Sequence, residues 1–194
     1  MLEGKIIWFW GLSGSGKTTL ADKLCNKLMY KLRTAEQEGQ IGVVSDIQRL
    51  DGDIVRQSLT KDLGFSIEDR FEHIRRVAFV ADLLSRHEVL VICSFITPLK
   101  AMRMFLREYL GDRLILIECR CPLEECMRRD PKKLYRAALY GKINNMTGLT
   151  SPFEAGPTNY PAGTTGETIV STYYWNEEQC LEQIINYLKE KKYL

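Results

Sequence analysis

The sequence lacks several features that would indicate particular classes of protein. No apolar run approaches the roughly 18 residues needed to cross a bilayer, and the short apolar stretch near the N-terminus has no small-residue cleavage site after it. Lys and Arg number 27 against 25 Asp and Glu, a net charge of only +2, whereas nucleic-acid binding proteins usually show a basic excess. We therefore expect no membrane partner, no nucleic-acid partner and a cytoplasmic location.

Cysteine and histidine are also too few, or wrongly spaced, for a metal framework. None of the six cysteines forms a zinc-ribbon or C-x-x-C pattern, and the two histidines have no third ligand beside them. A chain of 194 residues with 45% hydrophobic composition can bury a core without disulfides or a structural metal. Cys93 and Cys119 lie in apolar runs and are expected to be buried, reduced thiols.

Short apolar runs alternate along the chain with helical patterns. Strands are expected leading into Leu50 and over 6–10, 89–95, 114–119 and 167–172; helices are expected from 17 to about 33 and over 69–87, 101–109, 123–129 and 177–189. This alternation predicts an α/β fold, a mostly parallel five-stranded sheet with helices on both faces. Its length suits a single domain covering residues 1–194.

Residues 130–166 differ from the rest in composition. They are rich in proline and glycine and begin with the basic sequence DPKKLYRAALYGK, for which a helix is expected. A segment this long is usually a functional lid or disordered. We expect a basic lid over approximately residues 128–160, although a solvated run of charges is the alternative.

The motif with the clearest chemistry follows the first expected strand. The sequence GLSGSGKT matches G-x-x-x-x-G-K-[ST] in full, the pattern of a phosphate-binding loop. Its main-chain N–H groups surround phosphate oxygens, its lysine reaches the β and γ phosphates, and its threonine ligates Mg²⁺. A glycine-rich turn without a nucleotide is the alternative, but the flanking strand and helix favour ATP binding. The expected ATP-binding residues are Gly11, Leu12, Ser13, Gly14, Ser15, Gly16, Lys17, Thr18 and Thr19.

Other users of this loop lack support in the sequence. No Asn-Lys-x-Asp guanine motif follows a strand, and no apolar run ends in paired Asp-Glu as in an ABC-type ATPase. The short chain, its arginine-rich middle and its basic lid favour a kinase that acts on a small molecule.

Further stretches are similar to one family in sequence and in order. These are GLSGSGKTT (11–19), LDGDIVRQSLTKDLGFSIEDR (50–70), HIRR (73–76), SFITP (94–98), RDPKKLYRAALYGKI (129–143), TGL (147–149) and SPFEAGP (151–157). Through them the chain resembles the adenylylsulfate (APS) kinases. The resemblance implies a three-layer P-loop kinase fold and ATP-dependent phosphorylation of the APS 3′-hydroxyl to give PAPS in sulfate assimilation. It also implies Mg²⁺ as cofactor, a homodimer and an ATP sulfurylase partner.

The resemblance assigns reaction chemistry to two residues. Asp53 would accept the proton of the attacking hydroxyl or hold Mg²⁺, directly or through water, together with Thr18; its alternative is a turn or helix-capping aspartate. Lys132, expected to begin the lid helix, would bind substrate and supply charge to the transferring phosphoryl group. With Lys17, these residues form the expected catalytic set.

The remaining assignments concern the acceptor. Arg56 and Arg70 would hold the anionic phosphosulfate group, the alternative being surface ion pairs. Phe65 would stack on the substrate base, or else be an ordinary core residue. Ile96 would line the pocket, with an ordinary buried isoleucine as its alternative. His73 lies three residues after Arg70, so it points either into the acceptor site or to the helix surface.

The chain departs from the family pattern around the acceptor. His73 stands where Asn is usual, Thr97-Pro98-Leu99-Lys100 stands where Ser-Pro-Tyr-Arg is usual, and Asn144 replaces a basic residue. Met146 replaces the expected Phe and would give Phe65 a flexible thioether partner. The connection over 34–47 also looks long. These changes leave two alternatives open: a relative acting on another nucleotide-linked molecule such as cytidine diphosphoramidate, and a nucleotide-binding module without turnover.

Overall fold

The computed structural model describes residues 2, 4–37, 46–157 and 167–194. Its sheet has the order β2-β3-β1-β4-β5, and all four pairings between neighbouring strands are parallel. The strands are β1 (Ile6–Trp10), β2 (Ile47–Asp51), β3 (Leu90–Ser94), β4 (Leu114–Arg120) and β5 (Glu167–Ser171). The three central strands are almost entirely buried, as strands covered on both faces must be.

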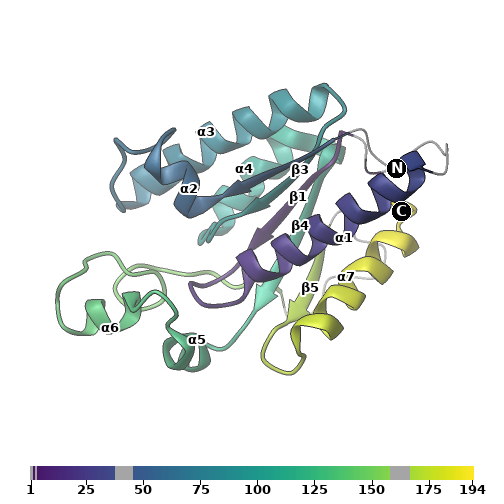
Figure 1. The fold of residues 1–194 in the computed structure, drawn as a ribbon. Helices are drawn as coiled ribbons and strands as arrows, with labels where there is room; N and C mark the ends of the chain where they lie inside the picture. Colours follow the sequence, from purple (N-terminus) through teal and green to yellow (C-terminus); the bar gives the residue numbers. More distant parts are fainter. Residues whose placement is uncertain (1, 3, 38–45, 158–166) are drawn as a thin grey trace.

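Helices cover the sheet on both faces (Figure 1). They are α1 (Lys17–Gln37), α2 (Gly52–Gln57), α3 (Ile67–Arg86), α4 (Lys100–Leu110), α5 (Leu123–Arg129), α6 (Leu134–Leu139) and α7 (Glu177–Glu190), with a 3₁₀ turn over Gly111–Arg113. Helices α1 and α7 pack in one core with Ile7 and Phe9, while α3 and α4 pack in the other with Ile6, Trp8 and Trp10. This alternation along β1 gives the three layers and confirms the predicted fold class.

The register brings the carboxyl ends of the inner strands to one edge. Phe9 and Asp51 both pair with Ser94, the last residue of β3. The loops that follow β1, β2 and β3 therefore meet at this edge, where α/β sheets bind ligands.

Three predicted local structures need correction. The expected turn at 51–53 is instead the start of α2, because the Asp51 side chain caps this helix by accepting a hydrogen bond from the Asp53 main-chain N–H. Within the basic sequence over 130–142 the helix α6 is shorter than expected, and Lys132 lies in the turn before it. The first helix extends to Gln37, past its expected end; the rest of the 34–47 connection, from 38 to 45, lies outside the described residues.

The lid segment packs against the phosphate-binding loop below the sheet edge (Figure 1). Tyr135 of α6 is buried and donates a hydrogen bond from its hydroxyl to the Ser13 carbonyl, 3.1 Å away. Leu12, Cys126 and Met146 complete a small apolar cluster there. All six cysteines are buried and none is paired in a disulfide, so the expected burial of Cys93 and Cys119 is confirmed. In the ranges that the structure describes, no helix is long and apolar enough to cross a membrane.

Candidate functional site

A cavity of about 750 Å³ lies at the carboxyl edge of the sheet. The phosphate-binding loop and the start of α1 form its middle. One lobe extends towards α2 and α3 and is lined by Asp53, Arg56, Phe65, Arg70, His73 and Ile96. The other lobe extends towards β5 and α7 and is lined by Arg129, Thr172, Trp175, Asn176, Glu177 and Cys180. The cavity can therefore hold two ligands on opposite sides of the loop.

The loop conformation depends on glycine. Gly11 has φ +143°, and a Cβ atom at this position would lie 2.5 Å from the Cys119 carbonyl oxygen. Beyond the loop, Lys17 is buried and donates a hydrogen bond to the Leu12 carbonyl at 2.5 Å. Burial lowers the pKa of Lys17 to about 8. A triphosphate bound here would give this buried amino group a negatively charged partner.

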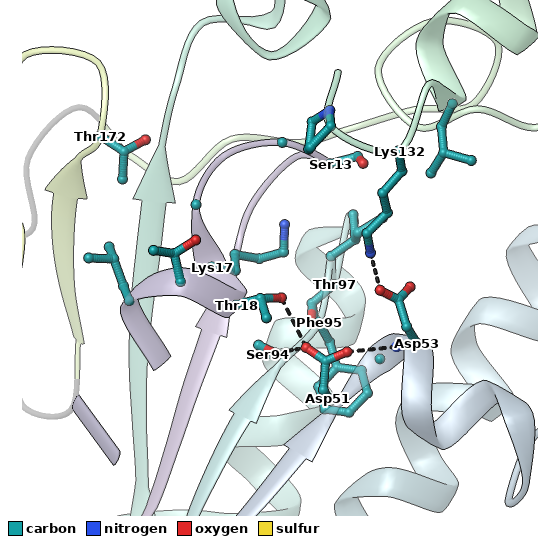
Figure 2. Close-up of a pocket in the computed structure, with 18 of the residues that line it drawn as sticks. Ser13, Lys17, Thr18, Asp51, Asp53, Ser94, Phe95, Thr97, Lys132 and Thr172 are labelled. Atoms are coloured by element: carbon teal, nitrogen blue, oxygen red, sulfur yellow. Dashed lines mark hydrogen bonds and ion pairs between the residues drawn. The ribbon is translucent and has the colours of Figure 1, made fainter. Parts of the chain in front are cut away.

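Asp51 lies at the centre of a hydrogen-bond cluster beside the loop (Figure 2). Its Oδ2 accepts hydrogen bonds from the Thr18 hydroxyl at 2.9 Å and the Ser94 hydroxyl at 2.7 Å. Burial opposes ionisation of Asp51, but the bonds from Ser94, the Asp53 main chain and Thr18 outweigh it and lower its pKa. The proton of Thr18 is thereby directed to Asp51, so the lone pairs of its hydroxyl remain available to a cation.

The lid reaches this edge of the cavity through Lys132. Its amino group forms an ion pair with the Asp53 carboxylate, as Figure 2 shows. Both side chains are about half exposed. Asp53 does not cap α2, since Asp51 does; its carboxylate faces the cavity instead. All three expected catalytic residues therefore line one cavity, and two of them, Asp53 and Lys132, are in direct contact.

Aromatic and cationic groups surround the lobe beside α3. The Arg56 guanidinium lies 4.4 Å from the Phe65 ring centroid, and that of Arg70 lies 5.6 Å away. Arg70 donates to the Phe65 and Asn145 carbonyls, at 3.0 and 2.6 Å. Burial, with Arg56 nearby, lowers the pKa of Arg70 to about 10, so it stays protonated at neutral pH. Phe65 is 52% exposed and is not a core residue.

His73 is buried in the same lobe rather than placed on the helix surface. Its Nδ1 is 2.8 Å from the Thr60 hydroxyl, and its ring meets Phe95 edge-on. Burial and the nearby Arg56, Arg70 and Arg76 lower the pKa of His73 to about 4, so its imidazole is neutral at pH 7. The lobe therefore presents two cations beside an uncharged ring.

Comparison with known proteins agrees with this arrangement. A family model described as adenylylsulphate kinase matches residues 3–161. This chain belongs to the adenylylsulphate kinase family. An adenylyl-sulfate kinase of Halothermothrix orenii is 42% identical over 195 residues, with 99% of this chain and 93% of the relative covered. One from Synechococcus sp. (strain JA-2-3B'a(2-13)) is 42% identical over 192 residues, covering 99% and 98%.

Solved structures extend this similarity to the fold. The Mycobacterium tuberculosis APS kinase in complex with AMPPNP and APS has a TM-score of 0.75 and 36% identity to this chain, with 96% of this chain and 98% of that structure covered. The adenylylsulphate kinase fold expected from the sequence is therefore confirmed.

Several lining residues of this adenylylsulphate kinase family member were not predicted from sequence. From the sequence, Asp51 is only part of an expected turn. Its position at a strand end, two residues before Asp53, is the signal that could have marked it as a site residue. Thr172 donates from its hydroxyl to the Ser15 carbonyl at 2.9 Å, and Arg129 donates to the Thr172 carbonyl at 2.6 Å. Trp175 lies in a turn without a recognisable motif, and only the fold places it in the cavity.

Of the departures from the family pattern, Met146 lies differently from its expectation. Met146 is buried in the cluster under the phosphate-binding loop and does not line the cavity; Arg56, not a thioether, covers the Phe65 ring. Thr97 is also buried, and its hydroxyl accepts a hydrogen bond from the Trp8 indole at 2.9 Å. Both substitutions therefore fill packed positions.

Proposed function

We propose that this chain transfers the γ-phosphoryl group of ATP to the 3′-hydroxyl of APS, giving PAPS and ADP in sulfate assimilation. The observation that carries the proposal is the shared cavity. It combines a phosphate-binding loop with the Asp53–Lys132 pair and an aromatic, arginine-lined lobe. A carboxylate between a triphosphate site and an anion-binding lobe is what transfer to a hydroxyl of an anionic nucleotide requires.

ATP is proposed to bind along the middle of the cavity. The main-chain N–H groups of the loop over residues 11–16 surround the phosphates, and Lys17 neutralises the β and γ oxygens. The lobe with Arg129, Thr172 and Trp175 lies on the far side of the cavity from Asp53, and we place the adenine base of ATP there. Trp175 is 44% exposed, so its indole is accessible for stacking on the base.

Mg²⁺ fits the donors beside the phosphates. Hydroxyl and carboxylate oxygens are the ligands that Mg²⁺ prefers, and it usually takes its other ligands from phosphates and water. We assign the Thr18 hydroxyl as its protein ligand, with Asp51 accepting the Thr18 proton. Asp53 lies beyond Asp51 and would meet the ion only through water. When bound, Mg²⁺ neutralises charge on the phosphates.

APS is proposed to occupy the lobe beside α3. Phe65 offers an exposed ring to the adenine, Arg56 and Arg70 bind the phosphosulfate oxygens, and Ile96 lines the pocket wall. In the structure Arg56 covers the Phe65 ring, so it must turn towards the anion when the base stacks. His73 is neutral and adds a polar but uncharged wall.

The transfer itself follows from the position of Asp53. The APS 3′-oxygen attacks the γ phosphorus, the bond to the β–γ bridging oxygen breaks, and the hydroxyl proton passes to the Asp53 carboxylate. Lys132 leaves Asp53 and stabilises the transferring group. The lid around Tyr135, which packs on the loop, keeps water from the γ phosphate and so suppresses ATP hydrolysis.

A coupled assay of ADP release tests this function against its alternatives. We expect APS to accelerate ADP release strongly, and AMP or cytidine diphosphoramidate to do so weakly. Faster turnover with cytidine diphosphoramidate would indicate a different acceptor. Absence of acceleration by any acceptor, with ATP still bound, would indicate a binding module. Lys17→Ala should abolish the APS-dependent rate.

We also propose that residues 1–194 act as one kinase domain with a lid over approximately 128–160, in the cytoplasm, as a homodimer supplied with APS by an ATP sulfurylase. Support for self-association comes from Phe79 and Leu83, which lie one turn apart on α3 and are at least half exposed. Light scattering should give twice the 22.4 kDa chain mass, and Leu83→Glu should halve that value. Co-purification tests the sulfurylase partner.

A further inference from the structure

Arg49, in the middle of the edge strand β2, joins three elements behind the phosphate site. Its guanidinium donates to Asp22 of α1 at 2.9 Å and to the Ser94 hydroxyl of β3 at 3.1 Å. It also donates to the Leu50 and Ile92 carbonyls, at 3.1 and 3.0 Å. A planar guanidinium that makes four such bonds holds its partners in one fixed geometry. Arg49 is therefore a rigid connection between helix and sheet.

The Arg49–Asp22 bond joins the same two elements as the Thr18–Asp51 bond, which orients the Thr18 hydroxyl. Thr18 and Asp22 lie one turn apart on the same face of α1, and Arg49 and Asp51 lie two residues apart on the same face of β2. The bonds Thr18–Asp51 and Asp22–Arg49 are thus two parallel links between the same helix and strand. The Asp22–Arg49 bond therefore fixes the spacing between α1 and β2 that the Thr18–Asp51 hydrogen bond needs.

Arg49 acts on Asp51 through the Ser94 hydroxyl, which contacts both. The Ser94 hydroxyl has a single proton, and Arg49 can only donate to its oxygen. Ser94 must therefore direct its proton to Asp51, which its Oγ meets at 2.7 Å. The Arg49 charge itself lies 3.7 Å from the Asp51 carboxylate. These contacts hold the Asp51 carboxylate in position to accept the Thr18 proton.

We propose that Arg49 is a positioning residue for the nucleotide-bound magnesium ion. Through Ser94 and Asp22 it holds Asp51 against Thr18, so the lone pairs of Thr18 face the metal. Arg49 is not one of the residues that line the cavity. The inference rests on the proposed magnesium-dependent kinase reaction. It concerns only the binding of the phosphoryl donor, ATP with Mg²⁺, and not the acceptor.

The test compares Arg49→Met with a matched arginine elsewhere. Arg113 also joins a serine and an aspartate, donating to the Ser85 hydroxyl at 2.7 Å and pairing with Asp82, away from the cavity. AMPPNP binding is measured by calorimetry with and without Mg²⁺. In Arg49→Met the gain in affinity that Mg²⁺ provides should fall about tenfold, a typical loss when support behind a metal ligand is removed. Arg113→Met should keep the full gain.

Kinetics supply a second readout, and Asp22→Asn a second variant. Arg49→Met should raise the Mg²⁺ concentration for half-maximal rate about tenfold while the KM for APS stays unchanged. Asp22 is exposed, so Asp22→Asn should fold even if Arg49→Met does not, and should shift Mg²⁺ dependence in the same direction. An unchanged Mg²⁺ gain in the folded variants would overturn the proposal. Because AMPPNP binding needs no acceptor, this result stands even if APS proves not to be the substrate.

Discussion

Lys132 of the lid and Asp53 at the start of α2 form an ion pair across the mouth of the cavity. The pair joins the carboxylate proposed to accept a proton and the cation proposed to stabilise the phosphoryl group. Each neutralises the other before substrates bind. Turnover therefore requires that bound ATP and APS separate them, which couples lid position to occupancy of the cavity.

Asp53→Asn should remove the proton acceptor while preserving the shape of the site. We expect kcat to fall by about 10²- to 10⁴-fold, the usual contribution of a general base. AMPPNP affinity should change little, because Asp53 belongs to α2 and not to the phosphate-binding loop. Steady-state kinetics and calorimetry measure the two quantities. A kcat within a factor of two of the unsubstituted protein would exclude Asp53 from proton transfer.

Lys17 should take up a proton when nucleotide binds at alkaline pH. Its pKa is about 8 in the free protein because the amino group is buried, and a triphosphate beside it raises that value. At pH 8.5 we therefore expect proton uptake on AMPPNP binding, seen as a dependence of the calorimetric enthalpy on the ionisation enthalpy of the buffer. Lys17→Met should abolish the uptake. Equal proton uptake in Lys17→Met would contradict this assignment.

The same depressed pKa has a consequence for stability without nucleotide. Between about pH 8 and pH 10.5 the unfolded chain holds a proton on Lys17 that the folded chain has released. The contribution of Lys17 to the free energy of unfolding therefore rises with pH across this window. In denaturant titrations, Lys17→Met should lose that rise, and a slope equal to the parent's would refute it.

Phe65→Ala should mainly weaken acceptor binding. Stacking of a base on an aromatic ring contributes about 1–3 kcal/mol, so the KM for APS should rise about 5- to 150-fold while the KM for ATP stays near its original value. Phe65→Trp should restore most of the loss. Tyr30→Ala removes an exposed aromatic ring outside the cavity and serves as the control. An unchanged KM for APS in Phe65→Ala would argue against stacking.

His73 should make the protein less stable in acid. Its folded pKa of about 4 lies below the unfolded value of about 6.5, so the unfolded chain binds the proton first. This contribution is complete above pH 6.5 and is lost as the pH falls towards 4, by at most about 3 kcal/mol. His73→Asn should show a weaker fall in unfolding free energy over that range. The same fall in both proteins would contradict a buried, neutral His73.

The sheet and most helices could be predicted because their signals are local. Apolar runs such as 6–10 and 114–119 mark buried strands, and the helix over 123–129 has the predicted bounds. The turn at 51–53 was mispredicted because Asp-Gly-Asp suits both turns and helix starts, and only the bond from the Asp53 main chain to the Asp51 carboxylate decides between them.

The candidate site divides in the same way. The phosphate-binding loop is a contiguous motif and could be found from eight letters. Asp51, Ser94 and Arg49 act together only because parallel pairing aligns β2 with β3, and Trp175 reaches the cavity only because β5 lies beside β4. Such relationships depend on strand order, which a single sequence does not state.

The most direct test of the central claim is the identity of the product formed from ATP, Mg²⁺ and APS, followed by ³¹P NMR. The account predicts a new phosphomonoester signal on the ribose 3′-oxygen of APS, formed in equal amount to ADP and at least about 100-fold more slowly with Asp53→Asn. ADP and inorganic phosphate as the only new species, or a phosphate on any other oxygen of APS, would contradict it.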